Sequence, residues 1–130
     1  MNKQKRVLTI QDISCLGQCS ITVALPILSA FGYETVILPT AVLSTHTAPC
    51  FSGFTLRDLT SDIAPISNHW KSLGISFDCI HVGYLCEGEQ TRIVGEQIDC
   101  LRNENTSVII DPAMADNGKL YPGFTPAHVQ

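Results

Sequence analysis

The sequence lacks the features that would place a chain in a membrane or outside the cell. Its 130 residues contain no apolar run approaching the about 20 residues that a membrane-spanning helix needs. Lys3, Lys5 and Arg6 precede only the short apolar stretch 7–10, which is too short for the centre of a secretory signal. We therefore expect a cytoplasmic protein that does not bind a membrane.

Basic residues are also scarce. Eight Lys and Arg stand against twelve Asp and Glu, which gives a formal net charge of −4. The basic residues form no stripe or cluster, whereas a surface that binds nucleic acid normally carries one. The sequence thus predicts no nucleic-acid partner.

The common nucleotide-binding and zinc-binding motifs are missing too. There is no Gly-Lys-Ser/Thr loop, no Gly-x-Gly-x-x-Gly loop and no Cys-x-x-Cys pair, and the four histidines are scattered. Without a secretory signal, we expect the cysteines to be reduced thiols, several of them buried as small apolar groups. A structural zinc site is the less favoured alternative. The six cysteines are Cys15, Cys19, Cys50, Cys79, Cys86 and Cys100.

What the sequence does contain is typical of one compact α/β domain. Apolar residues make up 45% of the chain and charged residues 15%, as in well-packed globular proteins. The dense apolar run in 6–13 predicts a buried strand. A helix is expected to open at Ser20 as N-cap and to stop at Gly32, with a bend at Pro26. A second strand is predicted over 33–38.

The second half of the chain continues this alternation. The segment 39–54 is rich in Thr, Ser and Pro and is predicted to be irregular or to form short flap strands. A helix with Trp70 on its apolar, core-facing stripe is expected next, ending at Gly74. The remaining predicted elements are a strand over 79–82, a helix with apolar residues between 93 and 101, and a strand over 108–110.

This order of elements predicts a three-layer αβα fold with a mainly parallel sheet. In such sheets, ligands gather at the carboxyl ends of the strands. The candidate site residues are therefore those that directly follow the strands, namely Asp12, the Gly17 loop, Tyr84 and the segment 111–118.

Two carboxylates, Asp111 and Asp116, stand five positions apart after the last predicted strand. They could reach one hydrated Mg²⁺ or its phosphates, because Mg²⁺ takes one or two carboxylates and fills its other positions with water and phosphate. The alternative is that Asp111 only ends a strand, and that 116–118 is only a turn. The spacing alone does not decide between them.

Three further loops have both a functional and a structural interpretation. The Gly17–Ser20 loop could bind an anion at a helix start, or simply pack strand against helix. Thr45, His46 and Thr47 could hold a hydroxypyridine ring, or could satisfy their own backbone. Tyr84 offers a ring face and a hydroxyl to a flat ligand, but a tyrosine that caps the core is an equal alternative.

Taken together, the segments resemble the N-terminal half of the pyridoxal kinases, a family of the ribokinase-like superfamily. The resemblance runs nearly end to end, and it rests on the order and spacing of several modest motifs. They are Thr-Ile-Gln-Asp at 9–12 with Gly17, Leu-Ser-Thr-His-Thr at 43–47, Phe-Thr-Leu-Arg-Asp-Leu-Thr at 54–60, Gly-Tyr-Leu at 83–85 and Asp-Pro-Ala-Met-Ala-Asp-Asn-Gly-Lys-Leu-Tyr at 111–121.

The resemblance implies ATP-dependent phosphorylation of the 5′-hydroxymethyl group of pyridoxal, pyridoxine or pyridoxamine. It also implies Mg²⁺ and a homodimer in the full-length protein, and it leaves the need for a monovalent cation open. By position, it assigns contact with the pyridine ring to Asp12, Thr47 and Tyr84, a place in the lid segment to His46, and a place near the phosphates and the water-linked Mg²⁺ to Asp111 and Asp116.

The sequence departs from the family pattern in three places. Asp12 stands where many members have serine, which could favour another ring substituent such as an amine. Ala115 replaces a usual glycine. The Gly-x-Gly-Asp motif that carries the family's catalytic base does not occur. We therefore expect residues 1–130 to be the N-terminal part of one kinase domain, with a flap at about 39–54, without the nucleotide-binding half, without a catalytic residue and without turnover alone.

Two alternatives remain open from the sequence. A hydroxymethylpyrimidine kinase of the same superfamily would act on a similar ring, although its usual glycine-rich opening is missing here. A non-catalytic α/β binding module is compatible with the sheet alone, because a fold does not fix a function. A truncated sheet should expose an edge and part of an apolar face, so we expect the isolated chain to be poorly soluble or to self-associate.

Overall fold

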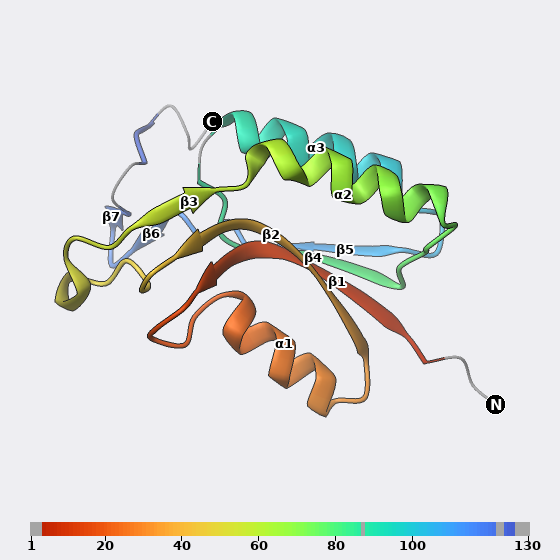
Figure 1. Cartoon of the computed structure of the whole chain (residues 1–130), viewed down its shortest axis with the longest axis horizontal. Coiled ribbons are helices and arrows are strands. Elements are labelled where there is room, and N and C mark those ends of the chain that lie inside the picture. Colours follow the sequence, from red (N-terminus) through yellow and green to blue (C-terminus); the bar gives the residue numbers. More distant parts are fainter. Residues whose placement is uncertain (1–3, 87, 122–123, 127–130) are drawn as a thin grey trace.

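The structure is a computed structural model that describes residues 4–86, 88–121 and 124–126. A central sheet separates one helix on one face from two helices on the other (Figure 1). The predicted three-layer αβα arrangement is therefore confirmed. Within the described part of the chain, none of the helices has the length and apolar character needed to cross a bilayer.

The central sheet has five strands in the order β3-β2-β1-β4-β5. Four of them are parallel, and only β3 runs antiparallel, along the end of β2. The chain moves from β1 outward to β2 on one side and then to β4 and β5 on the other. The direction of winding thus switches between β1 and β4, where open α/β sheets commonly bind ligands. The strands are β1 (Arg6–Ser14), β2 (Glu34–Leu43), β3 (Leu56–Asp58), β4 (Cys79–Val82) and β5 (Ser107–Ile110).

Strand β1 lies at the centre and is buried as predicted. Leu8, Thr9 and Ile10 are each 0% exposed, which is the pattern of a strand covered on both faces. Near its end, the pairing register with β2 shifts between Gln11 and Ile13. Such an irregularity can re-aim side chains where a strand reaches a site.

Helix α1 (Ile21–Ala30) connects β1 to β2. The expected start is right, but the expected hydroxyl cap at Ser20 is wrong. Ser20 has φ 51° and ψ −123°, outside the extended conformation of an ordinary N-cap, and its side chain makes no capping bond. Thr22 Oγ1 instead accepts from the Cys19 backbone N–H at 3.0 Å. The helix assignment continues through Pro26, and the bend there stays a prediction.

Strand β2 is longer than predicted. It continues to Leu43, so the irregular part of the expected flap begins at Ser44. Pro39 concealed this continuation because proline cannot donate a backbone hydrogen bond. The described part of β3 pairs only with β2 residues 41–43, so Pro39 has a strand partner on one side alone. A short 3₁₀ turn, η1 (Pro49–Phe51), follows in the flap.

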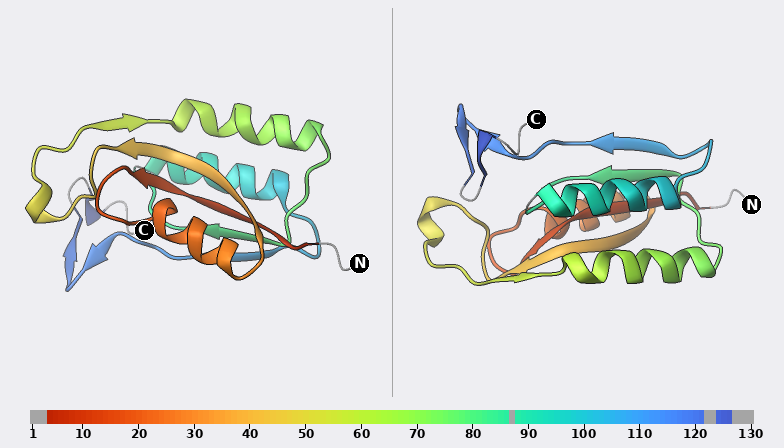
Figure 2. Two further views of the ribbon diagram at one scale, coloured as in Figure 1. Left: turned by 60° about the horizontal axis from the view of Figure 1, so that its bottom comes forward. Right: turned by 90° about the horizontal axis from the view of Figure 1, so that it is seen from above.

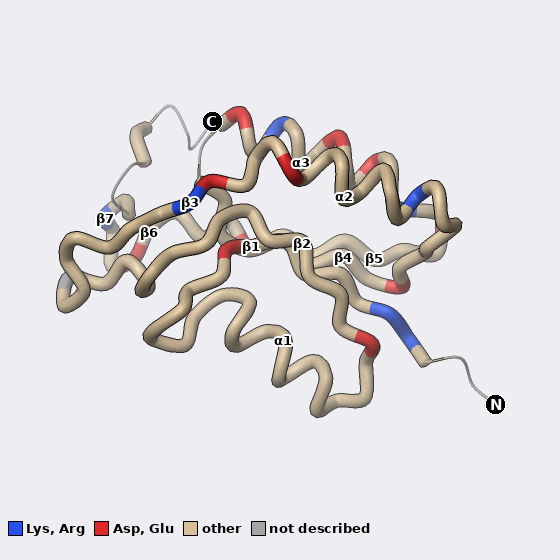
Figure 3. Tube along the Cα trace, viewed as in Figure 1, with Lys and Arg blue, Asp and Glu red and all other residues tan. Residues whose placement is uncertain are grey.

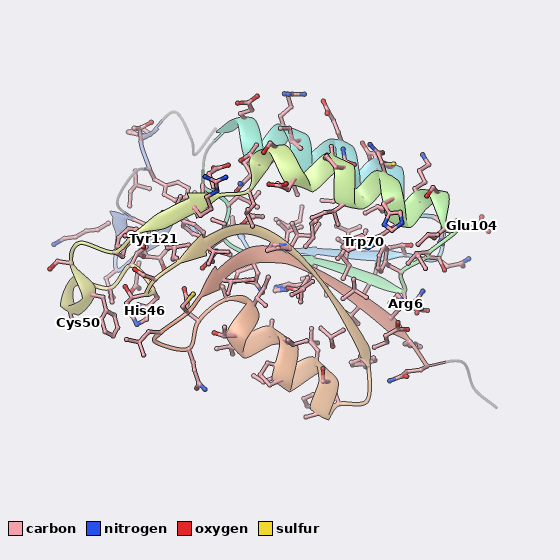
Figure 4. All side chains as sticks on the ribbon, in the orientation of Figure 1. Arg6, His46, Cys50, Trp70, Glu104 and Tyr121 are labelled. Atoms are coloured by element: carbon pink, nitrogen blue, oxygen red, sulfur yellow. The ribbon has the colours of Figure 1, made fainter. Side chains whose placement is uncertain are left out.

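Helices α2 (Thr60–Ser72) and α3 (Gly88–Leu101) pack side by side on the other face. Trp70 is partly buried against the core, and its ring centroid lies 6.0 Å from that of Phe77 (Figure 4). The prediction that Trp70 belongs to the core is confirmed. The buried core consists of Leu8, Ile10, Leu38, Ile63, Phe77, Ile80, Val82, Val94, Ile98 and Leu101.

The prediction of buried cysteines is wrong. Cys15, Cys19 and Cys50 are exposed, and the other three cysteines are only partly covered. The exposed ones lie in the loop after β1 and in the 3₁₀ turn of the flap, and not in the buried strands. All six are free thiols in this structure.

Candidate functional site

The carboxyl ends of β1, β2, β4 and β5 meet at one end of the molecule, close to the small hairpin of β6 (Ala115–Asp116) and β7 (Lys119–Leu120) (Figure 1). A cavity of about 780 Å³ opens there, a size typical of small-molecule sites. All six residues singled out from the sequence line it, although their roles in binding stay predictions. They are Asp12, His46, Thr47, Tyr84, Asp111 and Asp116.

Asp12 comes from the end of β1 and is only 3% exposed. Ser14, which is also buried, donates its hydroxyl to Asp12 Oδ2 at 3.0 Å. The described residues give no hydrogen bond to the second oxygen, Oδ1. One oxygen is therefore held in place by the protein while the other can accept from a molecule in the cavity.

Tyr84 follows β4 and is half-buried at the cavity wall. Its ring contacts Phe124 edge-on at a centroid distance of 5.7 Å. Burial, and then the charges of Cys86 and Asp12, raise the pKa of Tyr84 to about 12. The phenol thus stays protonated at neutral pH and can donate a hydrogen bond to a ligand.

His46 and Thr47 line the cavity from the segment that follows β2. The His46 ring accepts a bond at Nδ1 from the Ala48 backbone N–H at 3.1 Å. Its edge packs against Phe51, with ring centroids 4.8 Å apart. Because Nδ1 is occupied as an acceptor, the neutral ring carries its hydrogen on Nε2. Figure 4 shows His46 at the same end of the molecule as Tyr121.

The loop after β1 packs directly on His46. Gly17 has φ +77°, and a Cβ added there would lie 2.2 Å from His46 Cδ2. Gly17 therefore packs against the flap, since any side chain there would displace the imidazole. This contact differs from the packing of strand against helix that the sequence suggested. Cys19 and Ser20 of the same loop nevertheless line the cavity.

Asp111 and Asp116 reach the cavity from the end of β5 and from β6. Between β6 and β7, Asn117 and Gly118 have φ 49° and 74°, which suits a tight Asn-Gly hairpin turn. The turn interpretation of 116–118 is thus right, and it is compatible with a functional one because the turn holds Asp116 at the cavity. Figure 3 shows the acidic position on β6 beside a basic position on β7.

The two carboxylates are compatible with a magnesium ion held through water. Nowhere in the described ranges do three His, Cys, Asp or Glu side chains gather as a ligand set. Two exposed carboxylates that share a cavity suit Mg²⁺, which keeps several waters and takes phosphate oxygens as further ligands.

Sequence reasoning missed several cavity residues. Gln11 and Ser14 flank Asp12 on the same strand end, so the carboxyl-end rule could have included them. Lys119 and Tyr121 belong to the hairpin segment 111–121, in which only the carboxylates were singled out. All four line the cavity, and Lys119 adds a positive charge near the two aspartates.

Comparison with curated proteins places the chain beside the pyridoxal kinases, while no family model matches it. A protein of Schizosaccharomyces pombe, provisionally named a pyridoxal kinase, is 27% identical over 128 residues. A Saccharomyces cerevisiae protein with the same provisional name is 30% identical over 128 residues. Each match covers 93% of this chain but only 40% and 39% of the relatives. The chain thus spans about two fifths of the length of these curated relatives.

Solved structures give the same result. A Bacteroides thetaiotaomicron protein, provisionally described as a phosphomethylpyrimidine kinase and crystallised with pyridoxal, is 40% identical with a TM-score of 0.92, over 98% of this chain and 44% of that one. Pyridoxal kinase of Lactobacillus plantarum is 29% identical with a TM-score of 0.87, over 98% and 45%.

A Leishmania donovani pyridoxal kinase bound to ADP and pyridoxamine is 20% identical with a TM-score of 0.82, over 91% of this chain and 43% of that one, and shows the fold alone. This chain therefore has the ribokinase-like fold and is similar, over nearly its whole length, to less than half of a pyridoxal kinase.

Proposed function

We propose that this chain is the N-terminal, substrate-binding part of a pyridoxal kinase. The complete enzyme would transfer the γ-phosphoryl group of ATP to the 5′-hydroxymethyl group of pyridoxal, pyridoxine or pyridoxamine. The observation that carries the proposal is that the six polar residues indicated by the sequence all line one cavity at the strand tips. Residues 1–130 would form one part of a single domain, and further sequence would supply the nucleotide-binding part.

The ring of the vitamer would bind between Asp12, Thr47 and Tyr84. A flat hydroxylated heteroaromatic ring carries both donors and acceptors. The cavity offers a carboxylate oxygen of Asp12 as acceptor and the protonated phenol of Tyr84 as donor, because the pKa of Tyr84 is raised to about 12. His46, in the segment that packs on the Gly17 loop, would cover the ring as part of a lid.

The phosphate end would lie toward Asp111, Asp116 and Lys119. The two carboxylates would hold Mg²⁺ through water. Bound there, the ion would supply positive charge against the phosphate oxygens, which is the main requirement of phosphoryl transfer. Lys119 lines the same cavity and would bind a phosphate oxygen directly. A monovalent cation, a homodimer and a cytoplasmic location stay predictions from the sequence.

No residue of this chain is proposed as the catalytic base. Phosphoryl transfer depends on positioning and charge stabilisation by several parts at once. We therefore expect the 130-residue chain to bind a vitamer weakly and not to phosphorylate it.

The direct test compares the complete gene product with the 130-residue chain in the presence of Mg·ATP. The complete product should phosphorylate at least one of the three vitamers, and the isolated chain should show no turnover. Absence of turnover by the complete product with all three vitamers would show that the proposal is wrong.

Hydroxymethylpyrimidine phosphorylation is the second candidate, because the structure with 40% identity is provisionally described as a phosphomethylpyrimidine kinase. That structure was nevertheless obtained with pyridoxal. A competition assay separates the two functions. We expect kcat/KM of the complete product to be higher for a B6 vitamer than for hydroxymethylpyrimidine, and the reverse order would favour the second candidate. A product that turns over neither would favour a non-catalytic binding module.

A further inference from the structure

Gln11 has no role in the site as described so far, although it lines the cavity. It lies beside Asp12 near the end of β1 and is only 5% exposed. A buried glutamine must place both ends of its amide, because an unmet donor or acceptor in the interior is costly. The question is which end faces the ligand.

The nitrogen end of the amide is held inside the sheet. Gln11 Nε2 donates to Thr9 Oγ1 at 2.8 Å, and Thr9 is completely buried. Thr9 Oγ1 also lies 3.3 Å from Nδ1 of His81, its partner across the β1–β4 pairing. A threonine hydroxyl that accepts from Gln11 has its own hydrogen free to donate to His81 Nδ1. These contacts hold the nitrogen of the Gln11 amide against Thr9, within the sheet.

The oxygen end lies against the backbone of Gly83, directly after β4. A Cβ added to Gly83 would come within 2.2 Å of Gln11 Oε1 and 3.0 Å of its Cδ. A glycine at position 83 is therefore needed for this position of the glutamine side chain. Gly83 lines the same cavity as Gln11.

Gln11 Oε1 has no hydrogen-bond partner among the described residues. Among the described residues, three side-chain atoms are fully enclosed and have no partner, namely Thr45 Oγ1, Ser67 Oγ and Gln97 Oε1. Gln11 Oε1 is not one of them. The oxygen is thus not fully enclosed. Gln11 and Gly83, against which the oxygen lies, both line the cavity, so a ligand bound there could approach this neutral acceptor.

We infer that Gln11 is a specificity-determining residue, whose side-chain oxygen accepts a hydrogen bond from a hydroxyl or amine group on the ligand ring. This inference rests on the proposed function and adds a second acceptor beside Asp12. The two acceptors differ in charge. The Asp12 carboxylate favours a cationic donor, whereas the neutral amide oxygen of Gln11 accepts from a neutral or a cationic donor. Thr9 is the positioning residue that keeps the oxygen directed at the ligand.

The test uses the complete gene product and three substrates that all keep the 5′-hydroxymethyl group. They are pyridoxine, 3-deoxypyridoxine and 4-deoxypyridoxine. Each deoxy compound differs from pyridoxine only in the loss of one hydroxyl, at ring position 3 or on the substituent at position 4. We expect the wild type to prefer pyridoxine over one of the deoxy compounds by about tenfold or more in kcat/KM, the size of one lost hydrogen bond in an enclosed site. In Gln11→Met, that preference should fall to about twofold or less, while the other ratio stays unchanged.

Gln97→Met is the matched control. Gln97 is another buried glutamine, 8% exposed, which lies on α3 and does not line the cavity. It should leave both substrate ratios at the wild-type values. Thr9→Val removes the hydroxyl that holds Gln11 and should reduce the same preference as Gln11→Met does. Thr9→Ser keeps the hydroxyl and should keep the preference. If the role of Thr9 were merely structural, both variants would change the stability of the protein and leave the substrate ratio unchanged.

The possible results separate the two claims. A wild type that phosphorylates pyridoxine, combined with a folded Gln11→Met variant that keeps both ratios, overturns the role of Gln11 and leaves the proposed function intact. A wild type that phosphorylates none of the three compounds overturns the proposed function and this inference with it.

Discussion

The two halves of the central sheet are covered very differently. Around β1 and β2, helices lie on both faces, and Leu8, Ile10 and Leu38 are 0% exposed. On β5, Ile109 and Ile110 are 56% and 62% exposed. The right-hand view of Figure 2 shows β5 along one margin of the molecule, beyond α3. The half that carries β5 is therefore open.

The open half also contains an apolar groove. It has a volume of about 530 Å³ and lies between α1 and the β4–β5 side of the sheet. Its lining includes Val7, Ala24, Ile27, Leu28, Tyr33, Cys79, His81 and Ile109. The strand tips, in contrast, already form a polar cavity. Among the described residues, a polar cavity is thus formed at the strand tips, whereas the β5 side of the sheet, the open flank, exposes apolar side chains. This contrast fits the proposal that the chain is part of a larger domain.

The largest expected effect is on the free energy of unfolding, when one isoleucine in each half of the sheet is replaced by alanine. In the 130-residue chain, Ile10→Ala on β1 removes a completely buried side chain and should lower the free energy of unfolding by about 2–5 kcal/mol. Ile109→Ala on β5 should lower it by about 0.5 kcal/mol or less, because that side chain is largely in water already. Urea unfolding of both variants measures the difference, and equal losses would contradict the contrast between the halves.

The next effect concerns the polar cavity. Asp12→Ser in the complete gene product removes the buried carboxylate but keeps a small polar group. If Asp12 favours a cationic ring substituent, the kcat/KM ratio of pyridoxamine to pyridoxine should fall by about tenfold, the value of one charge-assisted hydrogen bond. An unchanged kcat/KM ratio would contradict the proposed role of Asp12, but it would not contradict the proposal that the ring binds in this cavity.

A smaller effect is expected from Tyr84 at high pH. Its folded-state pKa of about 12 lies above the ordinary value of 10.0, so the folded state holds this proton more tightly than the unfolded state. The associated stability is fully present below pH 10 and is lost as the pH rises toward 12. The loss should be about 1 kcal/mol, after allowance for solvent screening. Tyr84→Phe should not show it, and parallel pH profiles for the two proteins would contradict the shift.

The smallest change in stability, but a clear change in association, is expected at the open flank. The wild-type 130-residue chain should self-associate, and Ile109→Lys should reduce its apparent mass in light scattering, because a lysine on an exposed edge opposes strand pairing. Leu73→Lys is the control, since Leu73 is 60% exposed at the end of α2 and outside the groove. A wild type that is a clean monomer would show that the open flank does not drive association.

The sequence predicted the parts of the fold that depend on local pattern. The apolar runs of β1 and β4 and the alternation of strands and helices gave the three layers. The rule that ligands gather at strand ends selected Asp12, Tyr84 and Asp111, which do line one cavity. These predictions succeed because the pattern of apolar residues and the order of the elements depend only on residues that are close in the sequence.

The features that were missed depend on distant partners. Whether β2 continues through Pro39 depends on where β3 pairs, and no local pattern gives that. Gln90 is 1% exposed on α3 and bonds to Thr40 O at 3.0 Å, fifty positions away. Gln11 is likewise held through Thr9 and His81. Buried glutamines look like surface residues in a sequence, because their partners become neighbours only in the folded chain.

The most direct measurement is a crystal structure of the complete gene product with bound pyridoxamine. The vitamer ring should lie in the cavity at the strand tips, with hydrogen bonds from its donors to Asp12 and from Tyr84 to the ring. A ring bound in the groove beside β5, or anywhere outside contact with the ends of β1 and β4, would contradict the central claim.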